Sequence, residues 1–142
     1  MIEPLVLIVE DNLLYLNLLA DILTHNDYRV ATARNGEEGI AQARELKPDL
    51  ILMDIQMPVL DGFQATRRIR MDVNLAGIPI IALTALAMTG DWEKCAEVGM
   101  NAYLSKPVNL EDLKRTIKTL IYQHPGTLFE AKINLDSSHN IP

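Results

Sequence analysis

The chain has 142 residues, of which 49% are hydrophobic and 23% charged, a composition typical of a globular protein with a single substantial core. Its formal net charge of −6 argues against direct binding to nucleic acid, because phosphate contacts need a basic surface. No apolar run approaches the roughly 18–20 residues of a membrane span, the first residues lack the basic region of a secretory signal, and one cysteine cannot form an internal disulfide, so we expect a cytoplasmic protein without membrane contact.

Short apolar runs alternate with longer amphipathic segments along the chain. The runs expected to form strands are residues 5–9, 28–33, 50–53, 78–83 and 102–104. The segments expected to form helices are residues 13–25, 37–46, 63–71, 89–98 and 109–122. Each strand is followed by a helix, and five such units predict an α/β domain built on a parallel sheet.

Turn and cap residues support several of these boundaries. Asn35-Gly36 turns the chain before the second helix, and Gly99 is expected to end the fourth helix in a left-handed conformation. The third helix closes with basic side chains, which predict a solvated helix end that complements the helix dipole. These basic residues are Arg67, Arg68 and Arg70.

The last twenty residues differ from the alternating part of the chain. Pro125-Gly126 breaks the last helix, and the residues after this break are too few for another domain. We therefore expect one domain over residues 1–122 and a C-terminal extension over residues 123–142. The sequence leaves open whether this extension is loose or packs on the last helix or on a second chain.

Polar residues follow the strands at the points where the apolar runs stop. Glu10-Asp11 follows the first strand, Asp54 the third, Thr84 the fourth and Lys106 the fifth. Ligands of open parallel sheets bind outside the carboxyl ends of the strands, so these residues should converge on one edge. Three carboxylates, a hydroxyl and an ammonium group at one edge predict a site for a divalent metal and a phosphoryl group.

Asp54 is the predicted nucleophile, because a carboxylate that attacks phosphorus gives an acyl phosphate. A lone aspartate at a strand end more often caps the next element, but Glu10-Asp11 ends the neighbouring strand. Three carboxylates this close repel one another unless a cation is present, and Mg²⁺ accepts carboxylate oxygens together with waters and a phosphate oxygen. Glu10-Asp11 could also serve as the N-cap of the first helix, and both roles are compatible.

Lys106 and Thr84 supply the remaining contacts of the predicted site. The ammonium group of Lys106 offers the positive charge that a developing phosphoryl group needs, although a single lysine is more often a surface residue. The hydroxyl of Thr84 can donate to a phosphate oxygen, although a threonine in this place also suits a turn. The spacing of the whole set carries the prediction rather than any one member.

Four segments of the sequence resemble motifs of one protein family. They are Val9-Glu10-Asp11-Asn12, the run from Leu52 to Pro58 with Asp61-Gly62, Leu83-Thr84-Ala85, and Tyr103-Leu104-Ser105-Lys106-Pro107. Together they closely resemble the receiver domains of two-component response regulators, over a match from about Leu5 to Tyr122. The resemblance implies a (βα)5 flavodoxin-like fold, a doubly wound parallel sheet of strand order 2-1-3-4-5. It also implies a signalling phosphoacceptor rather than an enzyme with a separate substrate.

The resemblance assigns metal-binding roles to four positions. Asp11 and Asp54 look like direct ligands of Mg²⁺, or of Mn²⁺ in its place. Gln56 matches the position that offers its backbone carbonyl oxygen, and Glu10 matches the position that acts mainly through metal-bound water. Glu10 stands where an aspartate is more frequent in the family, a variation that should not abolish metal binding.

The resemblance also implies phosphotransfer and a conformational switch. The donor would be a histidine kinase or a histidine phosphotransfer protein, and the acceptor Asp54. Thr84 and Lys106 match the residues that contact the phosphoryl group, and Tyr103 matches an aromatic side chain that turns inward as Thr84 moves; by itself, Tyr103 could simply be the edge of the core. The face formed by the fourth helix, fifth strand and fifth helix would then change, for a downstream protein target or a homodimer.

Three other functions compete with this prediction. An aspartyl phosphatase needs a second acid two residues after its nucleophile, and this chain has Gln56 there. A nucleotide or flavin binder needs phosphate-binding Gly, Ser or Thr in its first loop, where this chain has Glu10-Asp11-Asn12-Leu13. An inert acidic pocket on a scaffold stays open as the third. The cognate kinase, the output partner, the phosphoryl lifetime, and the choice between a stand-alone regulator and a receiver excised from a hybrid kinase cannot be read from the sequence.

Overall fold

In the computed structural model, which describes residues 2–85 and 91–122, the chain forms five alternating β–α units. The strands are β1 (Leu5–Val9), β2 (Arg29–Ala33), β3 (Leu50–Asp54), β4 (Ile80–Thr84) and β5 (Ala102–Ser105). The helices are α1 (Leu13–His25), α2 (Gly36–Leu46), α3 (Gly62–Met71), α4 (Asp91–Val98) and α5 (Leu110–Tyr122). All neighbouring strands are parallel and lie in the order β2-β1-β3-β4-β5, which confirms the predicted topology.

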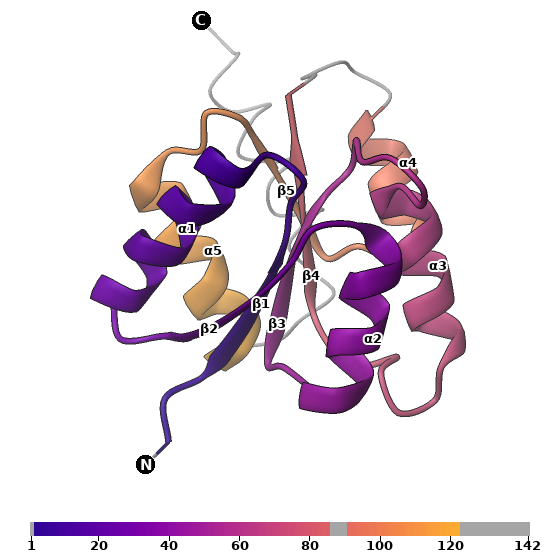
Figure 1. Ribbon diagram of the computed structural model, residues 1–142, viewed down its shortest axis with the longest axis horizontal. Coiled ribbons are helices and arrows are strands. Elements are labelled where there is room, and N and C mark those ends of the chain that lie inside the picture. Colours follow the sequence, from indigo (N-terminus) through magenta and orange to yellow (C-terminus); the bar gives the residue numbers. More distant parts are fainter. Residues whose placement is uncertain (1, 86–90, 123–142) are drawn as a thin grey trace, which may run out of the picture.

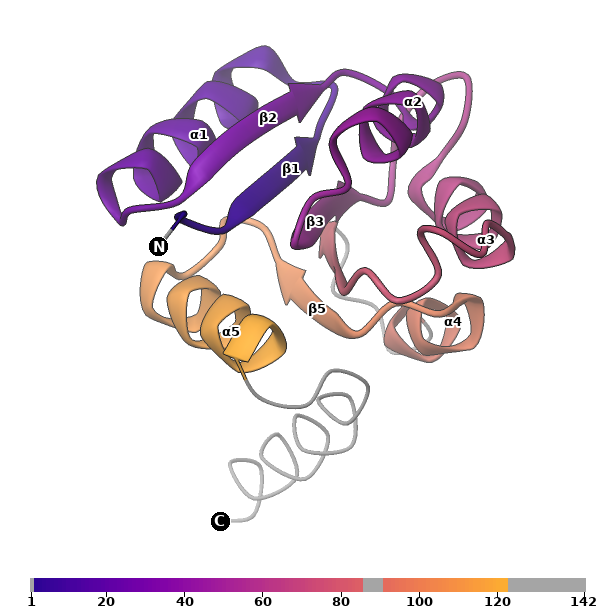
Figure 2. The same cartoon turned by 90° about the horizontal axis from the view of Figure 1, so that it is seen from below.

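The sheet is the middle one of three layers (Figures 1 and 2). Helices α1 and α5 cover one face, while α2, α3 and α4 cover the other. Side chains alternate between the faces of each strand, so the strands contribute to two separate cores. On β1, for example, Val6 and Ile8 pack toward α1 and α5, and Leu7 and Val9 pack toward the other three helices. Strands buried on both faces explain the uniformly apolar runs in the sequence.

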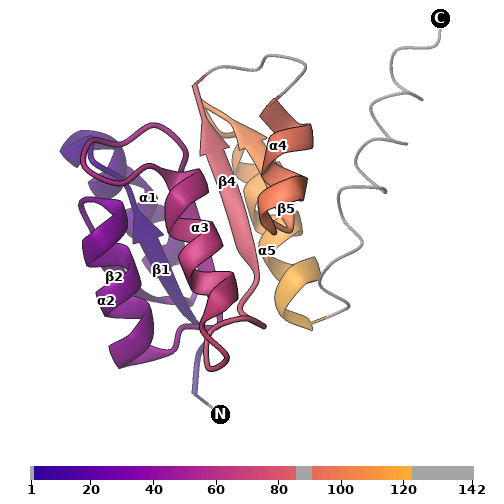
Figure 3. The same cartoon turned by 90° about the vertical axis from the view of Figure 1, so that its right-hand side faces the viewer.

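The strand register brings the carboxyl ends of the central strands to one edge (Figure 3). Val9 pairs with Met53, so the residues that follow β1 lie beside the end of β3. Asp54 pairs with Leu83, and Thr84 pairs with Ser105. The residues expected to carry the function therefore lie at the same edge, around the point where the chain crosses from one side of β1 to the other.

The first three helices begin at side-chain caps. Asn12 Oδ1 accepts a hydrogen bond from the Tyr15 amide at 3.1 Å, and Asn35 Oδ1 accepts one from the Glu38 amide at 2.9 Å. Helix α3 has a reciprocal arrangement, in which Asp61 and Gln64 each accept a hydrogen bond from the other's backbone amide. Such caps satisfy amide groups that the helix itself leaves without partners. They fix where each helix leaves the edge of the sheet.

The predicted boundaries match the observed ones to within two residues. Strand β4 begins at Ile80 rather than at residue 78, and it includes Thr84. Pro79 has no amide to donate, but its carbonyl oxygen accepts a hydrogen bond from the Ile51 amide at 2.9 Å. Gly99 has φ of 104°, which confirms the predicted left-handed end of α4. The predicted start of that helix at residue 89 and the extension over residues 123–142 lie outside the described residues.

The prediction of a solvated basic end for α3 is wrong at Arg70. The side chains of Arg67 and Arg68 are exposed, but the guanidinium group of Arg70 is half-buried and bonded to four acceptors. It joins α3 to the turn before β4 and to the α4–β5 junction, and burial lowers its pKa. Within residues 2–85 and 91–122, no helix is long and apolar enough to cross a membrane.

Candidate functional site

Three acidic side chains meet where β1 and β3 end. Glu10 and Asp11 directly follow β1, and Asp54 is the last residue of β3. One carboxylate oxygen from each lies within 4.8 Å of those of the other two. Glu10 is 0% exposed and Asp54 3% exposed, whereas Asp11 is half-buried. The structure therefore brings together the three carboxylates that the sequence placed at separate strand ends.

The backbone holds Glu10 and Asp11 through bonds to β2 and to α1. The Glu10 amide donates to the Ala33 carbonyl oxygen at 3.0 Å, which extends the β1–β2 pairing by one residue. The Asn12 amide donates to Glu10 Oε2 at 3.4 Å, and Asn12 in turn caps α1. The Asp11 carbonyl oxygen accepts a long hydrogen bond of 3.3 Å from Arg34. The two acids are thus fixed by the end of β2 with the residue that follows it, and by the start of α1.

Asp54 is held by the close approach of the loop that follows it and the start of α3. A Cβ atom on Gly62 would lie 2.4 Å from the Asp54 carbonyl oxygen, so only glycine allows this approach. The Ile55 amide donates to the Leu83 carbonyl oxygen at 2.9 Å, and the Gly62 amide donates to the Ile55 carbonyl oxygen at 2.9 Å. The Gln56 amide also donates to Asp54 Oδ1 at 3.3 Å. The orientation of this carboxylate is therefore set by the chain on both sides of it.

Lys106 reaches the acidic cluster from the end of β5. Its ammonium group forms an ion pair with Glu10 and lies 3.4 Å from Asp54 Oδ1. The Lys106 amide donates to the Thr84 carbonyl oxygen at 2.7 Å, which ties the base of this side chain to the end of β4. Removing Lys106 would leave buried carboxylates without this partner, which is costly. The predicted convergence of Lys106 with the acids is confirmed.

The crowding of these charges shifts their proton affinities. Burial, together with the hydrogen bond and the negative charge of Glu10, raises the pKa of Asp54 to about 8. Burial also opposes ionisation of Glu10, but hydrogen bonds with Asp54 and Lys106 outweigh it and lower the pKa of Glu10. Burial works against the charge of Lys106, but the two carboxylates prevail and raise its pKa. Without a metal ion, Glu10 and Asp54 therefore share one proton at neutral pH.

The donor set of this cluster suits a hard divalent cation. Carboxylate oxygens are the ligands that Mg²⁺ prefers, and Mg²⁺ keeps waters in its other positions. The raised pKa of Asp54 shows that the cluster lacks positive charge when only Lys106 is present. Asp11, Asp54 and Glu10 each bring a carboxylate oxygen within 4.8 Å of the other two, a spacing suitable to hold such an ion. In the described part of the chain, this is the group of acidic side chains with metal-binding spacing.

Thr84, Tyr103 and Gln56 lie on elements that neighbour those of the acids. Thr84 ends β4 with only 1% exposure, and Tyr103 lies on β5 beside Ala82 and is half-buried against the core of α2, α3 and α4. Gln56 lies in the loop two residues after Asp54, with an exposed side chain. The structure thus brings Thr84 and Gln56 to the edge that carries the acids. The contribution of the Gln56 carbonyl oxygen to a metal remains a prediction.

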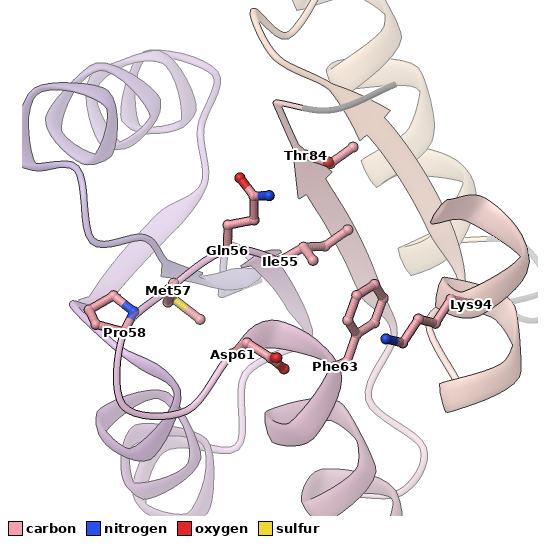
Figure 4. A pocket seen from close by; sticks show the side chains of 8 residues that line it. All are labelled: Ile55, Gln56, Met57, Pro58, Asp61, Phe63, Thr84 and Lys94. Carbon is pink, nitrogen blue, oxygen red and sulfur yellow. The ribbon is translucent and has the colours of Figure 1, made fainter. Parts of the chain in front are cut away.

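A pocket of about 520 Å³ lies beside this edge, between the loop after β3, the start of α3, and α4 (Figure 4). Gln56 and Thr84 line one side, and Phe63 and Lys94 line another. The Lys94 ammonium group lies 4.5 Å from the centre of the Phe63 ring. The pocket leaves open space next to the loop that follows Asp54.

Tyr15 is a residue near the site that sequence reasoning missed. It lies in the first turn of α1, and its hydroxyl oxygen accepts a hydrogen bond of 3.1 Å from the Val108 amide. Its ring centre lies 4.9 Å from the Lys106 ammonium nitrogen. The sequence offered one signal, an aromatic residue four positions after Asp11, but nothing in it connected that residue to the end of β5.

Comparison with known proteins places this arrangement in a family. The family model for the response regulator receiver domain matches residues 6–118. The chain belongs to this family. It is 44% identical, over 116 residues, to the polar-differentiation response regulator DivK of Brucella anthropi, a match that covers 82% of this chain and 94% of the relative. The resemblance inferred from the four motifs is therefore confirmed.

Solved structures of receiver domains share the fold. The receiver domain of a sensor histidine kinase from Pseudomonas aeruginosa, crystallised with a magnesium ion in its active-site cleft, is 41% identical, with a TM-score of 0.79 over 84% of this chain and 98% of that one. A chemotaxis protein of Vibrio cholerae is 30% identical, with a TM-score of 0.79 over 83% of this chain and 98% of that one. This receiver domain thus has the flavodoxin-like architecture predicted from its sequence.

Proposed function

We propose that this receiver domain takes a phosphoryl group from a phosphohistidine donor onto Asp54 and passes the signal on by a change of surface. The observation that carries the proposal is the buried cluster of Glu10, Asp11 and Asp54 with the Lys106 ammonium group against it. Membership of the family makes a kinase or another phosphodonor the expected partner. The donor would be a histidine kinase or a histidine phosphotransfer protein.

The proposed chemistry forms one bond and breaks one. An oxygen of the Asp54 carboxylate bonds to phosphorus while the phosphorus–nitrogen bond of the donor breaks, and the leaving imidazole takes up a proton. Asp54 must be ionised to attack, and because its pKa is raised to about 8, added positive charge at the site would favour the attacking form. The hydrogen bond from the Gln56 amide at 3.3 Å and the close approach of α3 keep the attacking oxygen in place.

The cation that suits this cluster is Mg²⁺, with Mn²⁺ as the alternative. Asp11 and Asp54 would bind it directly, Gln56 through its backbone carbonyl oxygen, and Glu10 through water. When bound, Mg²⁺ supplies positive charge that allows Asp54 to ionise and that balances the phosphoryl oxygens. Lys106, paired with Glu10 and held 3.4 Å from Asp54 Oδ1, would stabilise the negative charge of the transferred group.

The proposed switch runs through Thr84 and Tyr103. A phosphoryl group at Asp54 adds acceptor oxygens that draw the Thr84 hydroxyl and the Lys106 ammonium group. Thr84 and Lys106 are joined by a backbone hydrogen bond of 2.7 Å, so movement at one strand end is passed to the other. Tyr103, three residues before Lys106 on β5, turns inward into the space that Thr84 leaves. The face of α4, β5 and α5 then changes its fit for a downstream protein or a second copy of the chain.

The proposed role leads to an expected location for the protein and to an expected division of the chain. We place the protein in the cytoplasm, where phosphohistidine donors have access to it, and expect no direct contact with nucleic acid. Residues 1–122 form the receiver, and residues 123–142 form an extension. The protein acts as a phosphoacceptor whose own site makes and breaks the aspartyl phosphate, rather than as an enzyme with another substrate.

Phosphorylation by small donors tests the proposal. The full chain is incubated with acetyl phosphate or with phosphoramidate, whose phosphorus–nitrogen bond resembles phosphohistidine, with and without Mg²⁺. Intact mass is compared for the wild type, Asp54→Asn and the matched control Asp27→Asn. Asp27 lies exposed in the turn before β2, at the opposite edge of the sheet. We expect one added phosphoryl group in the wild type and the control, dependent on Mg²⁺, and none in Asp54→Asn.

Two outcomes would contradict the proposal. A phosphoryl adduct on Asp54→Asn would show that another residue carries the phosphoryl group. No adduct in the wild type, together with no binding of beryllofluoride in the presence of Mg²⁺, would leave the cluster as an inert acidic pocket. Binding of beryllofluoride without a lasting adduct would instead indicate rapid hydrolysis and support the proposal.

A further inference from the structure

We propose that Tyr15 is a positioning residue that holds Lys106 ready for the phosphoryl group. Tyr15 belongs to α1 and Lys106 to the end of β5, and the Tyr15 side chain joins the two through both its hydroxyl and its ring. The inference deepens the proposed function and rests on it, because it makes Tyr15 a second residue on which the contact between the Lys106 ammonium group and the phosphoryl group depends.

The hydroxyl of Tyr15 fixes the chain that carries Lys106. Its oxygen accepts a hydrogen bond of 3.1 Å from the amide of Val108, two residues after Lys106. On the other side, the Lys106 amide donates to the Thr84 carbonyl oxygen at 2.7 Å. The segment that begins at Lys106 is therefore tied to β4 at the lysine itself and to α1 after it. Tyr15 itself is fixed because its own amide donates to the cap residue Asn12 at 3.1 Å.

The ring of Tyr15 acts on the ammonium end of the Lys106 side chain. Lys106 has four rotatable bonds between its backbone and its charge, so reaching one position costs conformational entropy. The ring centre lies 4.9 Å from the ammonium nitrogen, within the distance at which an aromatic face attracts a cation. Glu10 and Asp54 also attract this ammonium group, but both are engaged once a metal ion binds to the acids.

An aromatic ring beside the Lys106 ammonium group has an advantage over a further carboxylate there. It attracts the ammonium group without adding negative charge to a cluster in which burial and Glu10 already oppose ionisation of Asp54. It also forms no hydrogen bond that the ammonium group would have to break before turning to a phosphoryl oxygen. Tyr15 can therefore keep Lys106 near Asp54 in both states of the domain, and this preorganisation favours binding of the transferred group.

The test separates the ring from the hydroxyl in the full chain. Tyr15→Phe keeps the ring and loses the bond to Val108, whereas Tyr15→Leu loses both, and Tyr15→Met serves the same purpose if the leucine variant does not fold. Tyr122→Leu is the matched control, because it removes an exposed tyrosine at the end of α5. The measurements are the proton chemical shifts of the Lys106 side chain by NMR, the Mg²⁺ affinity, and the beryllofluoride affinity at saturating Mg²⁺.

The expected result is specific to Lys106. The ring-current shift of the Lys106 side-chain protons disappears in Tyr15→Leu or Tyr15→Met and persists in Tyr15→Phe and in the control. Beryllofluoride affinity falls about three- to tenfold in Tyr15→Leu, the effect expected of one cation–ring contact, while Mg²⁺ affinity changes less than twofold. Tyr15→Phe keeps most of the wild-type affinity. Packing of Tyr15 away from the Lys106 ammonium group would lower the affinity without moving the lysine signals.

Each other outcome would overturn a defined part of the inference. Unchanged lysine shifts in Tyr15→Leu would mean that the ring does not hold Lys106, and unchanged beryllofluoride affinity with altered shifts would mean that the contact does not assist phosphoryl binding. If the wild type bound no beryllofluoride at all, the proposed function would fail. The NMR comparison would then still decide whether Tyr15 positions Lys106.

Discussion

The ammonium nitrogen of Lys106 lies 3.4 Å from Oδ1 of Asp54, so the base that would stabilise a phosphoryl group already contacts the residue that would carry it. The same ammonium group is paired with Glu10, which is fully buried. In the absence of a metal ion, Lys106 therefore neutralises the charges that a metal ion would otherwise neutralise. If the cluster binds Mg²⁺ as proposed, Lys106 and Mg²⁺ should compete for the acids before phosphorylation and act together after it.

This competition predicts opposite effects of one substitution. Lys106→Met should raise Mg²⁺ affinity about tenfold or more, because unit charges about 4 Å apart interact by several kcal/mol even at an effective dielectric constant of about 20. The same change should abolish detectable binding of beryllofluoride, which needs the ammonium group. Fluorescence or calorimetric titration of Mg²⁺ measures the first effect. Lys118→Met, on the exposed face of α5, is the control, and weaker Mg²⁺ binding in Lys106→Met would refute the competition.

The raised pKa of Asp54 predicts that metal binding releases a proton. With a pKa of about 8, this carboxyl group is mostly protonated at pH 7 when no metal ion is bound, and it must ionise to become a ligand. Mg²⁺ affinity should therefore rise up to about tenfold per pH unit below pH 8 and level off above it. Calorimetry in buffers of different protonation enthalpy should show close to one proton released at pH 7 and almost none at pH 9.

The same shift has a consequence for the stability of the metal-free protein. Asp54 has a higher pKa in the folded state than in the unfolded state, so between pH 4 and pH 8, roughly, the folded state binds more protons. This group therefore favours folding most at low pH, and its contribution is lost as the pH rises toward 8. Asp54→Asn should remove both this dependence and the proton release, and a proton count that stayed the same in Asp54→Asn would assign the proton to another group.

The order of strands and helices could be predicted because each element of this fold leaves a local pattern in the sequence. Strands covered on both faces read as uniform apolar runs such as Leu50–Met53, and polar residues stop each run at the edge where ligands bind. Glu10, Asp54, Thr84 and Lys106 each mark such a stop. Their convergence follows from strand order alone, and therefore needed no knowledge of side-chain contacts.

Contacts between elements could not be predicted in the same way. Tyr15 and Arg70 both reach across to another unit, and neither contact leaves a local pattern. In α1, the leucines alone do not reveal which ones are buried: Leu16 and Leu19 pack on the sheet, whereas Leu14 is 84% exposed. A helical periodicity gives the element but not its rotation when apolar residues occur on most of its faces.

Replacement of Arg70 by lysine should cause a large loss of stability although it keeps the positive charge. Its guanidinium group donates to the carbonyl oxygens of Gly99, Ala76 and Ile78 and to Asn101 Oδ1, over 2.8–3.0 Å. A lysine cannot reproduce this planar set of donors, so Arg70→Lys should cost about 2–3 kcal/mol in the free energy of unfolding. Urea denaturation measures this. Arg68→Lys, on the exposed side of α3, should change stability by less than about 0.5 kcal/mol.

The buried hydroxyl group of Thr66 leads to the opposite expectation, namely that its replacement stabilises the protein. Its hydroxyl oxygen is buried in α3 and, among the described residues, has no hydrogen-bond partner. Valine has nearly the same shape and lacks the polar atom, so Thr66→Val should raise the free energy of unfolding by about 1 kcal/mol, with an unchanged urea m-value. A loss of stability would mean that the hydroxyl has a partner, such as a buried water molecule. Thr119→Val, on α5, loses a hydroxyl that does donate, to the Arg115 carbonyl oxygen, and should not gain stability.

The loop after Asp54 contains a strained residue whose replacement should also stabilise the fold. Val59 has φ of 72°, and the Leu60 amide donates to the Pro58 carbonyl oxygen at 2.8 Å, which defines a three-residue γ-turn with Val59 at its centre. A β-branched side chain is disfavoured in this region, and Val59 is 76% exposed, so little packing compensates for the strain. Val59→Asn should therefore raise the free energy of unfolding by about 1 kcal/mol, because asparagine tolerates positive φ.

Val73 provides the matched control for this effect. It is 88% exposed and has no positive φ, so Val73→Asn makes the same chemical change without relieving strain, and its effect should stay within about 0.5 kcal/mol. Equal effects at the two positions would assign any gain to the loss of exposed apolar surface instead. Because Val59 lies between Gln56 and the start of α3, Mg²⁺ affinity is measured in the same variants. A stabilised variant with weaker Mg²⁺ binding would show that the strained turn helps to hold the loop in the geometry that the metal site needs.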